Sequence, residues 1–143
     1  MEYARNVLGI LDAEHEETAP SASTLLISKL SCSLVGRTQT IKIKPGSRAY
    51  QAYRQEEATE QFHCNYGLNP QFFDKVDSAG LKITGVDLEE GARIVELSDH
   101  PFYLATLFLP QISSTHENPH PLIVEYVKVA IAFQASRKQE VKI

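Results

Sequence analysis

The sequence is poor in several residue types that mark specialised classes of protein. It has no tryptophan, its only methionine is Met1, and its two cysteines, Cys32 and Cys64, are too few for a disulfide-stabilised scaffold. No apolar run approaches the roughly 20 residues of a membrane-spanning helix, and the first residues lack the charged-then-apolar pattern of an export signal. We therefore expect a soluble, cytoplasmic protein that does not bind membranes.

Basic charge is scarce and scattered along the chain. The 14 lysines and arginines are outnumbered by 18 acidic residues, which gives a formal net charge of −4. Nucleic acid is therefore not an expected partner, because its phosphates require clustered basic side chains. The sequence also contains no glycine-rich phosphate loop, so we expect no cofactor.

The first half of the chain carries mixed helix and strand signals. Residues 1–9 predict a short helix that stops at Gly9 but has no N-cap, so we expect the chain to begin inside an element. A loop is expected over 10–24, and periodicity leaves the segment over 24–30 open between strand and helical turn. Strands are expected over 38–44 and 59–66. Between them, Ser47 should cap a short helix that holds Ala49, Tyr50 and Tyr53.

The second half is signalled more clearly. Asn69 and Pro70 predict the start of a helix that Gly80 ends, and residues 81–88 and 92–98 alternate as strands. Residues 102–109 are apolar on both faces and predict a central strand covered on both sides. A last helix is expected over 121–136, followed by a solvated tail, with a buried stripe formed by Leu122, Ile123, Tyr126, Val127, Ala130, Ile131 and Phe133. The chain is therefore of the α/β class.

Five collinear segments are distinctive: "EYARNVLG", "KPGSRAYQAY", "NYGLNPQFFDKVDSAGLKITG", "VELSDHPFYLATLF" and "PHPLIVEYVKVA". Together they resemble the glutaminase domain of CTP synthase. The resemblance implies the C-terminal half of a flavodoxin-like class I glutamine amidotransferase fold, with a mostly parallel sheet flanked by helices. The family role would be glutamine-dependent synthesis of CTP from UTP. We expect a single glutamine amidotransferase-like domain over residues 1–143, either truncated at its N-terminal side or paired with a separate N-terminal half. In the truncated case an uncovered sheet edge and helical face would favour a homo-oligomer.

The catalytic residues implied by the resemblance are not intact. The family uses a Cys-His-Glu triad in which a thiolate attacks the glutamine amide, an imidazole moves the proton and a carboxylate orients that imidazole. The nucleophile position would fall upstream of Met1, and the family's "FHPEF" motif aligns with "FLPQI". Leu109 therefore stands in the histidine position and Gln111 in the glutamate position. Neither side chain can perform the proton chemistry, so we expect no glutamine hydrolysis by this chain.

The ligand-binding residues implied by the resemblance are partly altered. Glu17 falls where the family places a glutamate that holds the substrate amino group, although a solvated charge in the run Glu14 to Glu17 is the simpler interpretation. The family's "RHRHRYEVN" aligns with "QFHCNYGLN", so Asn65 replaces an arginine that holds the substrate carboxylate, and Tyr66 matches an aromatic. An alternative function is therefore a non-catalytic binding or regulatory module for a small amino-acid-like ligand. A third is an enzyme of different chemistry that uses a partner's cysteine.

Two further constellations have simpler interpretations. "HENPH" over 116–120 matches the zinc pattern H-E-x-x-H, but Pro119 breaks the helix that this pattern needs, so we expect a loop and no metal site. His63 and Cys64 are neighbours on an expected strand and would point to opposite faces, which predicts a small core cysteine rather than a nucleophile with its base. A base for Cys64 would have to come from His100, His116 or His120.

Overall fold

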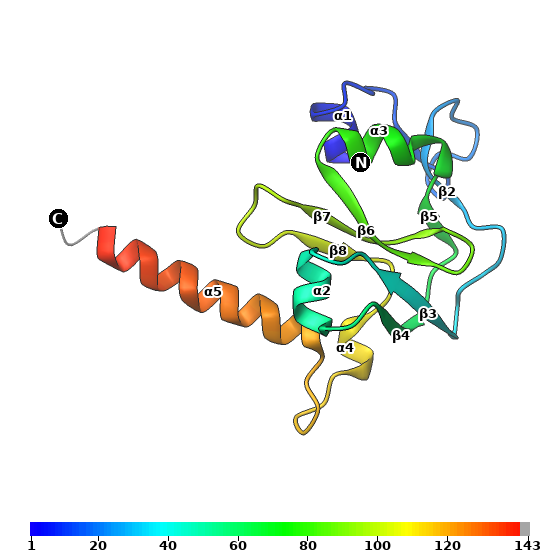
Figure 1. The fold of residues 1–143 in the computed structure, drawn as a ribbon. Helices are drawn as coiled ribbons and strands as arrows, with labels where there is room; N and C mark the ends of the chain where they lie inside the picture. The colour runs from blue at the N-terminus through cyan, green and yellow to red at the C-terminus, as the bar shows by residue number, and fades with distance from the viewer. Residues whose placement is uncertain (141–143) are drawn as a thin grey trace.

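The fold is described by a computed structural model that covers residues 1–140 (Figure 1). Its helices are α1 (Glu2–Asn6), α2 (Arg48–Tyr53), the 3-10 turn η1 (Pro70–Phe72), α3 (Phe73–Ser78), α4 (Pro110–Ser113) and α5 (Pro121–Glu140). Its strands are β1 (Glu14–His15), β2 (Leu25–Lys29), β3 (Arg37–Ile43), β4 (Glu57–Phe62), β5 (Tyr66–Leu68), β6 (Leu81–Asp87), β7 (Ala92–Leu97) and β8 (Leu104–Thr106). The α/β class is thereby confirmed.

The strands form two sheets. The larger sheet has the order β4-β3-β6-β7-β8, and each of its neighbouring pairs is antiparallel. The smaller sheet has the order β1-β2-β5, in which β1 and β2 are parallel and β2 and β5 are antiparallel. The expectation of a mostly parallel sheet is therefore wrong for the strands described here. Only four residues join β6 to β7, which is too few for the crossover that parallel strands require.

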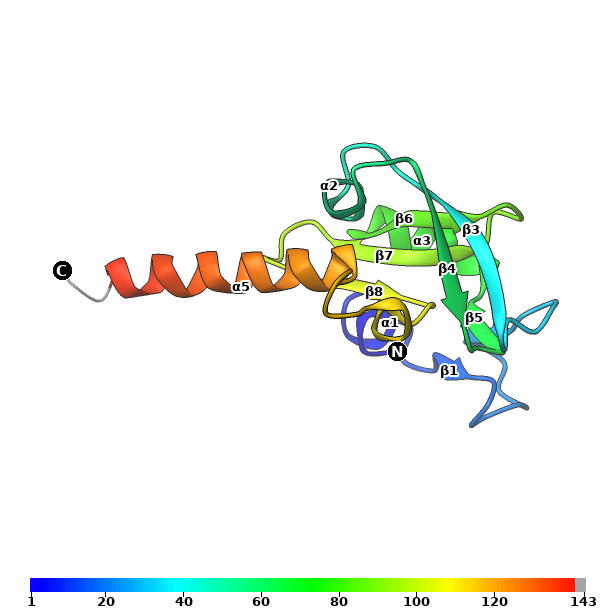
Figure 2. The ribbon, with the colours of Figure 1, turned by 90° about the horizontal axis from the view of Figure 1, so that it is seen from below.

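The larger sheet curls so that its two edges meet (Figure 2). Phe62 at the end of β4 forms an isolated antiparallel bridge with Phe108, which follows β8, and the Leu109 N–H donates to the Gln61 carbonyl at 3.2 Å. The two phenylalanine rings pack edge to face with their centroids 5.8 Å apart. Around this seam lies the main core, made of Leu34, Ile41, Ile43, Ala49, Ala58, Phe62, Ile94, Phe108 and Leu122.

A second, smaller core lies under the N-terminal segment. It consists of Ala4, Ile10, Ala13, Leu26 and Val76, and so joins α1, β2 and α3. Arg5 fixes the intervening loop, because its guanidinium donates to the Ala13 carbonyl and pairs with Glu14 at 2.8 Å. This packing holds β1 in place beside β2 in the smaller sheet, and so positions the acidic run that begins at Glu14.

Two helix starts agree with the sequence signals. The Ser47 hydroxyl accepts a hydrogen bond from the Tyr50 N–H at the start of α2, and the Asn69 side chain accepts one from the Gln71 N–H before α3. Both are side-chain caps of the expected kind. The segment over 24–30, left open by its periodicity, contains strand β2.

Two expected strands differ from the structure. The strand expected over 59–66 is divided into β4 in the larger sheet and β5 in the smaller one, with His63 to Asn65 between them. The central strand expected over 102–109 is the three-residue edge strand β8. Leu104 packs against the main core and Ala105 is exposed, and Phe108 enters the core after β8 has ended. Apolar content alone therefore misplaced this strand.

The last helix is present but is not buried as expected. Helix α5 leaves the body of the protein after its first turns and projects away from both sheets (Figures 1 and 2). Leu122 is 5% exposed and belongs to the core, whereas Tyr126, Val127, Ile131 and Phe133 are exposed by 55%, 48%, 63% and 49%. The expected stripe is thus mostly uncovered. The expected tail from residue 137 is helical through Glu140, and residues 141–143 lie outside the described part of the chain.

Candidate functional site

A cavity of about 440 Å³ lies between the smaller sheet and the residue that follows β8. It is lined by residues of four segments: the end of β1 with the residues after it, strand β2, the connection from β4 into β5 with β5 itself, and the residue after β8. The lining residues are His15, Glu17, Ile27, His63, Cys64, Asn65, Tyr66, Gly67, Leu68 and Leu107. The three residues predicted to bind a ligand thus line one cavity; they are Glu17, Asn65 and Tyr66.

Local hydrogen bonds hold the acidic side of this cavity. The Glu17 N–H donates to the His15 Nδ1 at 3.1 Å, which orients the imidazole. The His15 ring in turn packs against the Tyr66 ring, with centroids 5.1 Å apart. The neighbouring Glu16 carboxylate accepts from the Lys29 N–H on β2 and is directed into that contact. Glu17 is therefore the exposed carboxylate that lines the cavity.

The part of the wall formed by Asn65 and Tyr66 is held by backbone pairing. The Leu30 N–H donates to the Asn65 carbonyl at 2.8 Å, and Tyr66 pairs with Lys29 in the antiparallel ladder of β2 and β5. These bonds fix the main chain of Asn65 and Tyr66 without using the Asn65 side chain. The division of the expected strand into β4 and β5 places residues 63–65 at the cavity wall, where a continuous ladder would have absorbed them.

His63 and Cys64 both line the cavity, but their exposures differ. His63 is exposed, and Cys64 is partly buried with its thiol donating to the Leu107 carbonyl at 3.3 Å. The partner of the thiol is therefore a carbonyl oxygen and not an imidazole. This contact supports the expectation that Cys64 is not paired with a base, while its position in the cavity wall differs from a fully enclosed core residue. Cys32 is an exposed free thiol.

Leu109 and Gln111 lie close to this cavity in sequence but outside its lining. Leu109 is the residue before α4, is partly buried, and is held by its N–H bond to Gln61. Gln111 is exposed within α4. Leu107, two residues before Leu109, does line the cavity.

A buried polar cluster that the sequence did not reveal joins α2, β4 and the start of α5. The His120 Nε2 lies 2.9 Å from the Glu60 Oε1, and the Tyr53 hydroxyl donates to the same carboxylate. Burial, and then the adjacent Glu60 carboxylate, raise the pKa of the Tyr53 hydroxyl well above its ordinary value. Nothing in the local sequence links these three residues, because they are brought together only by the packing of three elements.

The neighbouring histidine of the "HENPH" segment is exposed. His116 is 99% exposed at its side chain, and α5 begins after the segment, at Pro121. The expected loop is thereby confirmed. Within residues 1–140, no three His, Cys, Asp or Glu side chains are grouped to hold a metal ion. Over the same range, no helix combines the length and apolar composition that crossing a membrane requires.

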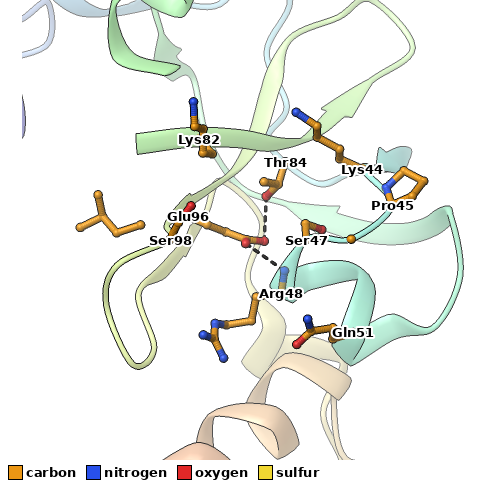
Figure 3. Close-up of a pocket in the computed structure, with 11 residues that line it drawn as sticks. Lys44, Pro45, Ser47, Arg48, Gln51, Lys82, Thr84, Glu96 and Ser98 are labelled. Atoms are coloured by element: carbon orange, nitrogen blue, oxygen red, sulfur yellow. Dashed lines mark hydrogen bonds between the residues drawn. The ribbon is translucent and has the colours of Figure 1, made fainter. Parts of the chain in front are cut away.

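A second cavity, of about 370 Å³, lies at the start of α2 (Figure 3). The buried Glu96 carboxylate on β7 forms its floor and accepts from the Arg48 N–H at 3.0 Å, the Ala49 N–H at 2.8 Å and the Thr84 hydroxyl at 2.8 Å. Three cationic side chains, Lys44, Arg48 and Lys82, stand at its rim. The Arg48 guanidinium lies over the Phe102 ring. The hydrogen bonds of Glu96 cap α2 by a side chain from another element.

Relatives of this chain include CTP synthases. The chain is 33% identical to the CTP synthase of Cytophaga hutchinsonii over 148 aligned positions, and 33% identical to that of Flavobacterium johnsoniae over 141. These alignments cover 96% and 92% of this chain but 28% and 26% of those proteins, so the chain spans about a quarter of the length of the relatives it matches. No protein-family profile matches the chain.

Two solved structures have a fold similar to that of this chain. The glutaminase domain of Trypanosoma brucei CTPS, solved with bound acivicin, superposes with a TM-score of 0.83 at 25% identity, covering 92% of this chain and 55% of that one. A putative GMP synthase protein from Thermoplasma acidophilum shares the fold, with a TM-score of 0.61 at 11% identity and 78% of this chain covered. The architecture is therefore that of a class I glutamine amidotransferase domain. Within that class, the chain belongs with the glutaminase domains of the CTP synthases and corresponds to their C-terminal part.

Proposed function

We propose that this chain is a pseudoenzyme relative of the CTP-synthase glutaminase domain and does not hydrolyse glutamine. The observation that carries the proposal is the pair Leu109 and Gln111, which occupy the positions where the family motif has histidine and glutamate. An aliphatic side chain cannot accept a proton from a thiol, and an amide cannot stabilise an imidazolium as a carboxylate does. Loss of the base in a triad lowers the rate by a factor of roughly 10⁶.

The family context of this proposal is glutamine-dependent CTP synthesis. Relatives bearing the name CTP synthase support that context for the chain. The role left to a domain without its triad is structural or regulatory. It would support the assembly or the control of nucleotide synthesis without supplying ammonia itself.

The test has two parts: the two residues are placed in an active relative, and the chain itself is assayed. In a CTP synthase that carries the "FHPEF" motif, the histidine and glutamate of that motif are replaced by leucine and glutamine, and we expect ammonia release from glutamine to fall by several orders of magnitude. The purified chain itself should release no ammonia from glutamine above the buffer rate. Ammonia production by the chain at an enzymatic rate, or full activity of the exchanged relative, would refute the proposal.

A second function, ligand binding, is favoured by the cavity lined by Glu17, Asn65 and Tyr66. These residues come from separate segments, and a carboxylate, a carboxamide and an aromatic ring facing one cavity suit a small amino-acid-like ligand. A thermal-shift series with such compounds tests this role. A compound that raises the melting temperature of the wild-type chain, but not that of Glu17→Gln, supports it, and no response to any compound argues against it.

We also propose a complementary segment of a glutaminase domain as the protein partner of α5. Two observations support this partner. The T. brucei glutaminase domain contains further chain beyond the 55% that matches, and Tyr126, Ile131 and Phe133 expose large apolar surfaces here. Apolar residues occur nearly all round α5, which is the pattern of a helix covered on several sides.

Sedimentation of the chain with and without the unmatched segment of a relative's glutaminase domain tests this partner. A one-to-one complex that Ile131→Lys abolishes supports it, with Lys128→Ala on the same helix as the matched control. Formation of a homodimer alone would instead identify a second copy as the occupant.

A further inference from the structure

We infer that the cavity lined by Glu17, Asn65 and Tyr66 selects a primary amine whose carboxyl group is absent or neutral, such as an amino-acid amide, over a free α-amino acid. The inference rests on the binding role proposed above for this cavity. It concerns the charge that the ligand must carry, and it follows from the side chains that line the site.

The formal charge of the cavity wall is negative. Among the ten residues that line it, Glu17 carries the one carboxylate, and none is a lysine or an arginine. Lys29 pairs with Tyr66 in the ladder of β2 and β5 but does not line the cavity, and two arginines are engaged elsewhere. Arg5 pairs with Glu14, and Arg93, which lines the adjoining cavity, is buried and pairs with Asp87. An ionised ligand carboxylate therefore meets no lysine or arginine in the wall and is repelled by Glu17.

The same wall favours an ammonium group. A carboxylate is the strongest partner that an ammonium finds among side chains, because the hydrogen bond between them is charge-assisted. The Tyr66 ring adds a face that attracts a cation, and its position is set by the contact with the His15 ring. Glu17 and the Tyr66 ring thus both favour a positive charge on the ligand.

Asn65 suits a neutral amide group of the ligand. Its carboxamide offers an acceptor oxygen and two N–H donors, which can pair reciprocally with a primary amide. A carboxylate accepts hydrogen bonds but donates none, so it would leave the Asn65 oxygen facing another oxygen. The main chain of Asn65 is already held by its bond to the Leu30 N–H, so replacement of the side chain leaves the cavity wall in place.

Isothermal titration of the whole chain with three probes at pH 7.0 tests the inference. The probes are L-glutamine, L-glutaminamide, in which a carboxamide replaces the α-carboxylate, and N-acetyl-L-glutaminamide, which has no ammonium. We expect L-glutaminamide to bind at least about tenfold more tightly than L-glutamine, since the reciprocal amide contact to Asn65 is gained and the repulsion between a ligand carboxylate and Glu17 is removed. N-acetyl-L-glutaminamide should bind at least about tenfold more weakly than L-glutaminamide.

Three variants separate the possible outcomes. Asn65→Arg restores a positive charge and should shift the preference toward L-glutamine by at least about tenfold, whereas Asn118→Arg, in the exposed loop before α5, should leave all affinities unchanged. Glu17→Gln should remove the preference for an ammonium. L-glutamine binding to the wild type as tightly as L-glutaminamide would overturn this inference but uphold the binding role. Failure of all three probes to bind the wild type would overturn both.

Discussion

The imidazole of His120 and the carboxylate of Glu60 lie 2.9 Å apart, and each side chain is only 4% exposed. The Leu122 N–H donates to the His120 Nδ1 at 3.2 Å, which places the proton of a neutral imidazole on Nε2, where it faces Glu60. One histidine thus caps the first turn of α5 and at the same time ties that turn to β4. The pair therefore fixes where α5 leaves the body of the protein.

Replacement of Glu60 by alanine should be strongly destabilising. The Tyr53 hydroxyl and the His120 Nε2 would both lose their acceptor in the interior, and breaking a buried pair on one side costs about 3 kcal/mol. Urea unfolding measures the change. Glu57→Ala, at an exposed position of the same strand, is the control and should change the free energy of unfolding by less than about 0.5 kcal/mol. Equal effects of the two substitutions would contradict this account.

Glu96 and Thr84 should be energetically coupled. Thr84 donates to the carboxylate that also caps α2, so removing either partner leaves the other incompletely paired. We expect Glu96→Ala and Thr84→Val to cost about 2 kcal/mol each in the free energy of unfolding, and the double variant to cost about 1 kcal/mol less than their sum. A double-mutant cycle by urea unfolding gives this difference. Simple additivity would show that the hydroxyl does not support the cap.

Asp77 should contribute a stability that is lost in acid. Burial acts to raise the pKa of its carboxyl, but the Ile83 N–H and the Lys82 ammonium outweigh it, and the pKa falls below its ordinary value of 3.8. A carboxyl with a lowered folded pKa stabilises the protein above its unfolded pKa and loses this effect as pH falls through the folded pKa. Because the side chain is 36% exposed, the contribution should be less than about 1 kcal/mol.

Unfolding of the wild type and of Asp77→Asn at pH 6 and pH 3 checks this sign. The two proteins should differ at pH 6 and converge at pH 3. Asp99→Asn, in the exposed turn after β7, is the control and should show no difference at either pH. A difference that grows toward acid would reverse the assignment.

The two ends of α5 should respond differently to truncation of their side chains. Leu122 is 5% exposed and lies in the core, so Leu122→Ala should cost about 3 kcal/mol. Ile131 is 63% exposed, so Ile131→Ala should cost less than about 0.5 kcal/mol in the chain alone. Urea unfolding of both variants makes the comparison. A large cost at Ile131 would mean that its side chain is already covered in solution.

Local signals explain which parts of the fold could be predicted. The Ser47 and Asn69 caps and the alternation of β3, β6 and β7 each depend on a few adjacent residues, and the structure has all of them. Strand direction depends on connections instead. The four-residue link between β6 and β7 was a usable signal for an antiparallel pair, whereas the return of β4 beside β3 after a helical connection was not.

Burial was the least predictable property of the chain. The apolar residues of α5 indicate that the helix is to be covered, but composition does not say by what, and within residues 1–140 most of them stay exposed. The clustering of Glu17, Asn65 and Tyr66 was suggested by resemblance and not by their spacing. The buried group formed by Tyr53, Glu60 and His120 had no sequence signal, since 60 residues separate the last two.

The anchoring of α5 at one end gives the molecule a long arm. From Leu122 to Glu140 a helix rises about 27 Å at 1.5 Å per residue, which is comparable to the diameter of a small domain. A body carrying such a rod rotates and diffuses more slowly than a sphere of equal mass. A force applied near the free end of α5 acts through the length of the helix as a lever. It therefore loads the hydrogen bonds of His120 at the first turn most strongly.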